Sequence, residues 1–486
     1  MEAESRRGGQ GAYPVDSASE SFSKEVLMRS VRRASCPLRF LFLFCVICST
    51  SPLVAQGLSP GDALYVADSS ADQVVRLEDR DGSGAIDPSV AGEVISFYDD
   101  ASPGPDLSTP GALVLDPARG LFLVDGGTLD SVLLLVDQND DDDANDDGEV
   151  SVYFDNTAGA PLLGTPNALV LNADGSFHLA DDGKSRALIL KLEDLNADGD
   201  ALDDGEWVTV YNSDTFDPDN LPVPSLADPE AMVVAPDGRI FVTDATRAVL
   251  FVLEDFNGDG DAMDGGEVRV YFDPGEDYAF GDPEGMTLGS NGSLFVTDED
   301  TGLILELVDF DGNGVVAGQN EVTSFIDQTA NLAPRDTNDI LALADGGLLI
   351  LDGSRDQVFL AIDGDGDGVA LSEGEVTGLL LTPDVLATPS GIAVSRSDIP
   401  PGAVFIRGDV NEDGQADMTD ALGILVYLFL DSTVELCEDS ADVDDDGNVT
   451  ITDPIRLLEH LFLGSEPPAM PYPDPGLDPS EDDLDC

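Results

Sequence analysis

The chain has 486 residues and a formal net charge of −77, from 98 Asp and Glu against 21 Lys and Arg. Such a polyanion excludes binding to nucleic acid or to an anionic membrane surface through a basic patch. Only two histidines, His178 and His460, are present, which excludes a zinc or iron centre built from several histidines. The hydrophobic content of 42% is too high for a disordered acidic chain and indicates folded domains.

Residues 1–55 are predicted to be a secretory leader. Several arginines precede the apolar run 40–48, and the small residue Ala55 follows it. A basic stretch, a short apolar core and a small-residue end are typical of a cleaved signal. A membrane anchor is the alternative, but the apolar run is too short to span a bilayer comfortably. We therefore expect a secreted or cell-surface protein without membrane insertion after leader cleavage.

The cysteines agree with export. Cys36, Cys45 and Cys48 leave with the leader, so that Cys437 and Cys486 remain. An even number of cysteines in an oxidising compartment favours a disulfide between these two.

One unit recurs six times between residues 56 and 398. Three apolar residues, a variable residue and an aspartate end one strand of each unit, and these aspartates are 54 to 63 residues apart. Short runs rich in β-branched and aromatic residues, separated by Gly, Asp and Pro, predict four strands in each unit. The aspartates are Asp68, Asp125, Asp181, Asp244, Asp298 and Asp352, and a residue present in every unit is expected to cap a turn.

Six four-stranded units predict an all-β, six-bladed propeller over residues 56–398. The first unit lacks its leading strand, and residues 389–394 supply one at the far end, which would close the ring and remove exposed sheet edges. A parallel solenoid is the alternative. The segment 229–244, with its Pro-Asp-Gly turn before a strand ending in Thr-Asp, resembles the repeat of NHL-type six-bladed propellers.

Acidic loops between the third and fourth strands have the spacing of calcium ligands. Blade four carries oxygen-bearing residues at loop positions 1, 3 and 5, and a glutamate at position 13. Alternate loop residues can direct the six to eight oxygens that calcium requires toward one centre. The predicted calcium ligands are Asp137, Asn139, Asp141, Asp143 and Glu149 in blade two; Asp194, Asn196, Asp198, Asp200 and Glu206 in blade three; Asp255, Asn257, Asp259, Asp261 and Glu267 in blade four; Asp309, Asp311, Asn313 and Glu321 in blade five; and Asp363, Asp365, Asp367 and Glu375 in blade six.

Blade one has a longer loop of the same kind, with Asp79, Asp81, Ser83 and Glu93. The alternative for all these loops is a solvated acidic turn, or the general acidity of a saline habitat. Acid scattered over every exposed face would favour that alternative, whereas here it recurs at one loop per repeat.

The starts of the first strands should ring the mouth of the channel on the face opposite the acidic loops. There Asn167, Glu230, Glu284 and Asn338 form a candidate channel site for a cation. Propeller lactonases of the gluconolactonase-like kind use a comparable metal site, and a polar, water-lined channel is the alternative.

A second module follows a linker at residues 399–406. Two twelve-residue loops, 33 residues apart, place oxygen-bearing residues at positions 1, 3, 5, 7, 9 and 12, and an apolar helix follows each loop. The predicted ligands are Asp409, Asn411, Asp413, Gln415, Asp417 and Asp420, and then Asp442, Asp444, Asp446, Asn448, Thr450 and Asp453.

Paired loop-helix units without an incoming helix resemble a dockerin over residues 407–466. The resemblance implies calcium as cofactor and a cohesin-like protein partner, or attachment to a surface assembly. A calcium-loaded cap that only packs on the propeller is the alternative. An acidic, Pro-rich tail at residues 467–486 follows.

The sequence contains no nucleophile motif, phosphate loop or dinucleotide fingerprint. We therefore favour an exported, calcium-binding propeller without catalysis, which binds protein or glycan at the cell surface or in an extracellular assembly. The alternative is a dockerin-tethered enzyme of lactonase or polysaccharide-degrading type that uses a metal at the channel.

Overall fold

The computed structural model describes a large part of both predicted modules. It covers residues 62–472 except 128–129, 140, 158, 160–161, 184–185, 216–224, 276–277, 279, 290–291, 300, 319, 328–329, 331–333, 344–345, 383–384, 396–405, 411–415, 417, 430–437, 446, 464–466 and 470–471. The predicted leader and both cysteines of the predicted disulfide lie outside these residues.

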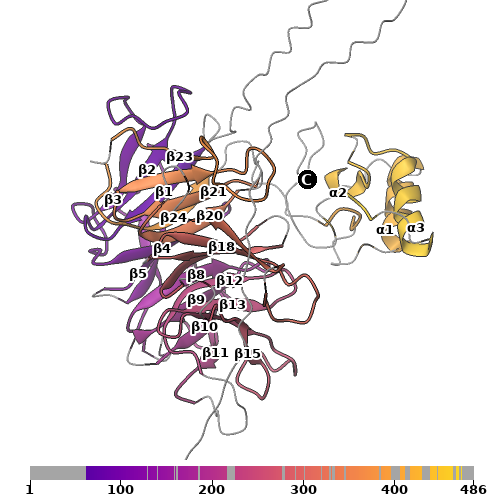
Figure 1. Cartoon of the computed structure of the whole chain (residues 1–486), viewed down its shortest axis with the longest axis horizontal. Coiled ribbons are helices and arrows are strands. Elements are labelled where there is room, and N and C mark those ends of the chain that lie inside the picture. Colours follow the sequence, from indigo (N-terminus) through magenta and orange to yellow (C-terminus); the bar gives the residue numbers. More distant parts are fainter. Residues whose placement is uncertain are drawn as a thin grey trace, which may run out of the picture. The chain divides into compact units, whose positions relative to one another are not determined.

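Six four-stranded antiparallel sheets form the blades of a propeller (Figure 1). From the innermost to the outermost strand, the blades are β24 (Pro389–Ser395), β1 (Ala63–Asp68), β2 (Gln73–Glu78) and β3 (Val94–Asp99); β4 (Pro110–Asp116), β5 (Gly120–Asp125), β6 (Ser131–Leu135) and β7 (Val150–Phe154); β8 (Pro166–Leu171), β9 (Phe177–Asp181), β10 (Leu188–Leu192) and β11 (Trp207–Asn212); β12 (Pro229–Val234), β13 (Ile240–Asp244), β14 (Val249–Leu253) and β15 (Val268–Phe272); β16 (Pro283–Leu288), β17 (Leu294–Asp298), β18 (Leu303–Leu307) and β19 (Val322–Ile326); and β20 (Thr337–Ala342), β21 (Leu348–Asp352), β22 (Gln357–Ala361) and β23 (Val376–Gly378).

The ring closes as the sequence predicts. The last propeller strand, β24, pairs antiparallel with β1, the first, so that Leu64 lies opposite Val394. The all-β six-bladed fold is thus confirmed. Closure leaves one outer edge strand on each blade, and the inner strands surround the central channel.

Local sequence explains the hairpins within each blade. In blade four, the turn between β12 and β13 contains Pro236, Asp237 and Gly238, and Gly238 has a φ of 87°. This left-handed conformation is readily adopted only by glycine. The amide of Ala235 donates to the carbonyl of Arg239 across the turn at 2.9 Å.

The hydrophobic core is divided into six clusters, each shared by two neighbouring blades. Between blades two and three, for example, Phe122, Tyr153 and Phe177 are fully buried, and the rings of Phe122 and Tyr153 meet edge to face at 5.0 Å. Burial of each large apolar side chain contributes about 1.5–3 kcal/mol. The blades are therefore held mainly by side chains packed between them.

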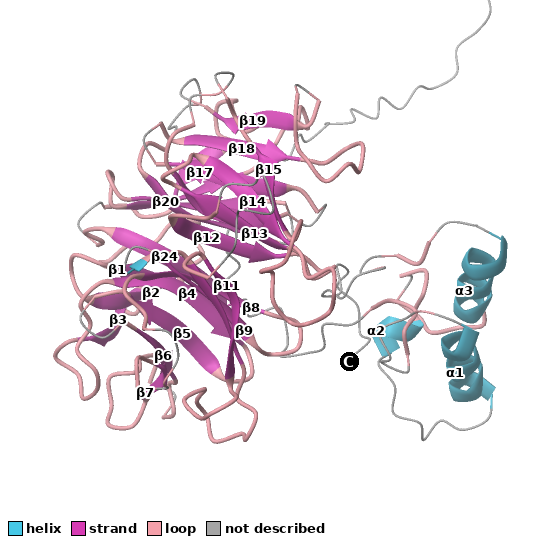
Figure 2. Cartoon of the chain, turned by 90° about the horizontal axis from the view of Figure 1, so that it is seen from below, coloured by secondary structure: helices cyan, strands magenta, loops and turns pink. Residues whose placement is uncertain are grey.

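Three helices form a small second unit, in which α1 (Met418–Phe429) and α3 (Thr452–Leu463) lie side by side and α2 (Glu438–Ala441) is short (Figure 2). Its core contains Ala421, Ile424, Val443 and Leu457. Among the residues that the structure describes, every helix is too short or too polar to cross a membrane.

Candidate metal-binding loops and channel mouth

Each acidic loop lies between the third and fourth strands of its blade, at the positions that the sequence predicts. In blade four the loop connects β14 to β15 and begins at Asp255. Carboxylate oxygens of Asp198, Asp200 and Glu206 in blade three lie within 4.8 Å of one another. Blades five and one bring together the acids at loop positions 1 and 3 with the closing glutamate, namely Asp309, Asp311 and Glu321, and Asp79, Asp81 and Glu93.

The first aspartate of every loop is oriented by a backbone amide. In all six blades its Oδ2 atom accepts a hydrogen bond from the amide at loop position 6, at 2.7–3.0 Å. In blade four, hydrogen bonds from Gly260 and Gly258 lower the pKa of Asp255. Amide donors favour the ionised carboxylate, so this residue is held in the form that binds a cation.

The closing glutamate of each loop is buried and bridges both ends of its loop. In blade four, Oε1 of Glu267 accepts from the Phe256 amide at 3.0 Å, and Oε2 accepts from the Asp264 amide at 2.8 Å. The other five blades repeat this arrangement with small shifts in position. Each carboxylate oxygen has further lone pairs, so the amides fix the orientation without exhausting the acceptor capacity.

The second loop of the helical unit uses the same hydrogen-bond plan. Oδ2 of Asp442, at position 1, accepts from the position-6 amide of Gly447 at 2.7 Å. The closing Asp453 accepts from the amides of Asp444 and Thr450, at 3.4 and 2.7 Å. Burial raises the pKa of Asp453 to about 6, and the charges of Asp442 and Asp444 add to the shift.

The first loop of the helical unit is described only in part. Asp409 and the closing Asp420 are buried, and Oδ1 of Asp420 accepts from the Val410 amide at 3.1 Å. Four predicted ligands of this loop lie outside the described residues, namely Asn411, Asp413, Gln415 and Asp417, and Asp446 of the second loop does so as well.

The structure brings predicted residues together at the channel mouth. The side-chain amide of Asn167, on β8, donates to Oε2 of Glu230, on β12, at 2.7 Å. Burial, with the neighbouring charge of Glu284, raises the pKa of Glu230 to about 9. Asn338 is the second residue of the corresponding strand β20, and its buried Oδ1 atom has no hydrogen-bond partner among the described residues.

The sequence analysis missed further acids at this mouth. Carboxylate oxygens of Glu230 lie within 4.8 Å of those of Asp182 and Asp228, and the same holds for Glu284 with Asp282 and Glu299. The repeated Asp-Pro-Glu at the starts of β12 and β16 would have pointed to two of these residues.

These additional acids shift the titration of the site. Burial and a hydrogen bond with Asp228 raise the pKa of Asp182 to about 6. Burial, then the charges of Glu299 and Asp282, raises the pKa of Glu284 to about 8. In contrast to Asp255, these groups favour the protonated form or a neutralising cation.

The aspartates that end the second strands act as turn caps. Oδ1 of Asp125 accepts from the amides of Ser108 and Thr109, at 3.0 and 2.8 Å. Asp181 and Asp298 bind the corresponding amides in their own blades. His178, on β9, is bonded to Asn172, and burial lowers its pKa to about 4. The hydrogen bonds of the capping aspartates and of His178 account for these residues without a catalytic role.

The geometry defines a class of protein, a six-bladed β-propeller with six acidic loops, joined to a helical unit with two such loops. Residues 407–461 match the family described as dockerin type I domain. The protein is thus a six-bladed propeller followed by a dockerin type I domain, as the sequence predicts.

Several solved structures are similar to the propeller. One is a nidogen/laminin complex, with 14% identity and a TM-score of 0.45, over 69% of this chain and 99% of that chain. A virginiamycin B lyase from Staphylococcus aureus has 13% identity and a TM-score of 0.41, over 69% and 86%. A protein of unknown function from Bacteroides caccae has 12% identity and a TM-score of 0.45, over 70% and 100%. None of the curated proteins matches the chain.

Proposed function

We propose that this protein is an exported, non-catalytic calcium-binding propeller, which its dockerin domain attaches to a cohesin-bearing extracellular or cell-surface assembly of cellulosome type. The propeller would then present protein or glycan to that assembly. The observation that carries the proposal is the dockerin match at residues 407–461, together with the recurrence of its loop plan in the propeller.

Calcium is the proposed cofactor of both regions. Dockerin type I domains typically bind calcium, and the loops offer the hard oxygen donors that this ion prefers. A ligand that binds only the folded state must raise stability. Calorimetry of the full chain in calcium and in EGTA tests this, and an unchanged melting temperature would contradict it.

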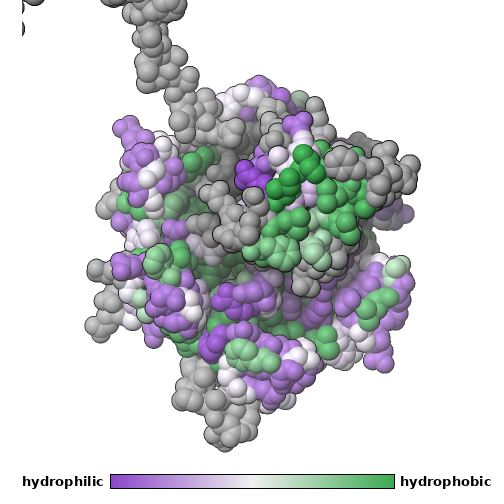
Figure 3. Space-filling view, turned by 90° about the vertical axis from the view of Figure 1, so that its right-hand side faces the viewer, coloured by the Kyte–Doolittle hydropathy of each residue, from purple (hydrophilic) through white to green (hydrophobic). Residues whose placement is uncertain are grey.

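Exposed apolar residues on the two main helices support docking to a cohesin. Met418 and Leu422 lie on α1. Ile451 and Ile455, each 33 residues further on, lie directly before α3 and in its first turn, and all four are exposed. Figure 3 shows apolar residues gathered on part of one face of the molecule. Exposed apolar patches of this kind mark interaction sites.

The docking proposal is tested with a panel of cohesin modules. Leu422→Glu, at a side chain that is 60% exposed, should abolish calcium-dependent binding without changing the melting temperature. Leu195→Glu is the matched control, because Leu195 is 63% exposed but lies in a propeller loop. Equal binding by both variants would contradict docking through α1.

For the propeller itself we propose a protein or glycan ligand. Many polar groups of the propeller have a structural role, because they cap the strand ends or orient the acidic loops. A glycan array probed with the full chain in calcium tests the glycan part, and the absence of any bound glycan would restrict the proposal to protein.

A second candidate function is an enzyme of lactonase or polysaccharide-degrading type. The raised pKa values of Glu230 and Glu284, at about 9 and about 8, favour it, because perturbed carboxyls cluster at functional sites. A screen of lactones and polysaccharides should then find an activity that Glu284→Gln abolishes. An activity that survives in this variant, or none at all, would contradict the enzyme.

A further inference from the structure

The loops also contact the neighbouring blade at one fixed position. The amide of the residue at loop position 8 donates to a carbonyl of the preceding blade at 2.8–2.9 Å in all six cases, and the acceptor lies in the outer strand except at the ring closure, where it directly follows β23. These bonds run from Ala144 to Phe97, Ala201 to Tyr153, Ala262 to Val210, Val316 to Tyr271, Ala370 to Phe325, and across the ring closure from Ile86 to Leu379.

The accepting carbonyl is released by a β-bulge. In blade three, Ile189 pairs with Tyr211 and Leu190 with Thr209, so that Val210 between them has no partner in the strand register. The same shift occurs in four other outer strands, at Phe97, Tyr153, Tyr271 and Phe325. A bulge turns one residue out of the ladder, and here the carbonyl of that residue accepts from the next blade.

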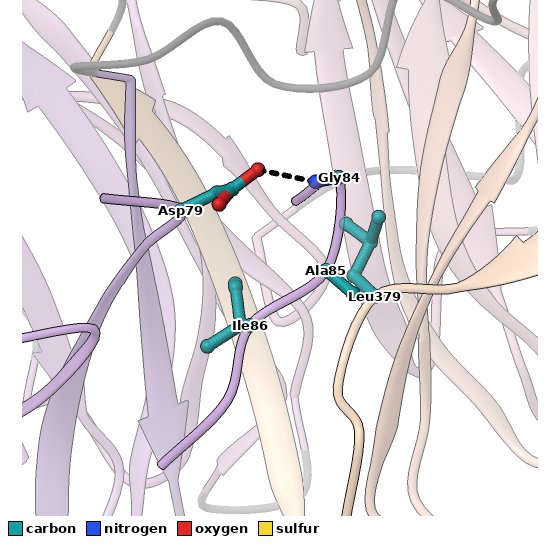
Figure 4. A pocket seen from close by; sticks show the side chains of 5 residues that line it. All are labelled: Asp79, Gly84, Ala85, Ile86 and Leu379. Carbon is teal, nitrogen blue, oxygen red and sulfur yellow. Dashed lines mark hydrogen bonds between the residues drawn. The ribbon is translucent and has the colours of Figure 1, made fainter. Parts of the chain in front are cut away.

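The position-8 side chains are buried in these joints. All six are Ala, Val or Ile, and none is more than 2% exposed. Figure 4 shows the joint at the ring closure, where Ala85 and Ile86 of blade one lie near Leu379 of blade six. In the same loop, Asp79 accepts from the Gly84 amide at 2.7 Å, two residues before Ile86.

We propose that the six loop-and-bulge contacts form a ring of metal-dependent joints, in which an ion bound by one blade's loop fixes its junction with the preceding blade. In blades two to four the position-8 residue directly follows a predicted ligand, as Ala262 follows Asp261, and in the other blades it lies between predicted ligands of the same loop. Ordering of the loop by an ion therefore orders the donor of the joint. The dependence on calcium rests on the proposed function, whereas the joint rests on the contacts above.

Hydrogen exchange of the full chain, resolved to single amides, tests the joints. In EGTA the six position-8 amides should exchange at least about tenfold faster than in calcium, while the amides between the second and third strands change less. A uniform change over both groups would overturn the inference, because general stabilisation would then explain it.

A substitution in one loop makes the test local. Asp255→Asn should prevent ion binding in the loop of blade four and speed hydrogen exchange of the Ala262 amide. The exchange rate of the Ala370 amide, two joints away, should not change. Asp237→Asn removes a charge from a turn of the same blade and serves as control. Ion counting on both variants accompanies the exchange measurement.

The two possible failures are distinguishable. If Asp255→Asn loses an ion and the Ala262 amide keeps its protection, the inference is wrong and the proposed function stands. If the variant keeps the full number of ions, the proposed function fails at this loop, and the inference falls with it.

Discussion

The propeller loops and the dockerin loops share one hydrogen-bond plan but differ in what they hold together. In both regions the first aspartate accepts from the position-6 amide, as in Asp255 with Gly260 and Asp442 with Gly447. Position 8 differs, because Ala262 bonds to the preceding blade whereas Val449 packs against the dockerin's own core. One loop plan therefore serves as a joint between blades in one region and as part of a small domain's core in the other.

Removal of calcium should have the largest effect on stability, and the effect should differ between the dockerin and the propeller. The described part of the dockerin has one small buried core, whereas six apolar clusters hold the propeller. Because small domains depend on bound metal for stability, EGTA should abolish the helical circular dichroism signal at 25 °C and only lower the melting temperature of the propeller. Retention of the helical signal in EGTA would contradict this difference.

Matched substitutions of the closing acid test whether the loops are equivalent. Glu267→Gln in the propeller and Asp453→Asn in the dockerin each remove a charge from a buried carboxyl that accepts one backbone amide from each end of its loop. Each should weaken calcium binding at its own loop by about tenfold or more. Titration calorimetry measures this, and a loss only in the dockerin variant would show that the shared plan does not imply a shared ion.

The channel mouth provides a contrast in pH dependence. The folded-state pKa of Glu230, about 9, lies above the ordinary value of 4.5. Protonation of Glu230 therefore stabilises the folded state, and this contribution to the free energy of unfolding is fully present below pH 4.5 and is lost as the pH rises toward 9. Glu230→Gln should therefore stabilise the propeller in chelator much more at pH 8 than at pH 5. Thermal melts at both pH values check this, and an equal effect at both would contradict the raised pKa.

Substitutions at loop position 8 should show the smallest difference in stability cost between the propeller and the dockerin. Val316 is 1% exposed between blades four and five, whereas Val449 is half-buried in the dockerin. Val316→Ala should therefore cost about 1–2 kcal/mol and Val449→Ala less than about 1 kcal/mol. Calcium-saturated denaturation measures both, and a larger cost at Val449 would contradict the account of the joints.

The repeat pattern predicted the fold because each blade repeats its strand signals and its terminal aspartate. Even the closing pair of β24 with β1 followed from a missing strand at one end and a spare one at the other. The joints were not predictable, since the partner of Ala262 is set by the packing of separate blades. Asp182 near Glu230 was missed for the same reason, because it comes from a neighbouring blade, whereas Asp228 lies only two residues before Glu230 and was predictable from the Asp-Pro-Glu repeat.

Calcium is proposed to occupy the propeller loops as well as the dockerin loops. Anomalous diffraction from crystals of the full chain grown in calcium would locate the ions directly. We predict anomalous density in the acidic loops of blades two to six and in both dockerin loops. Density in the dockerin alone, with none in the propeller loops, would contradict the account.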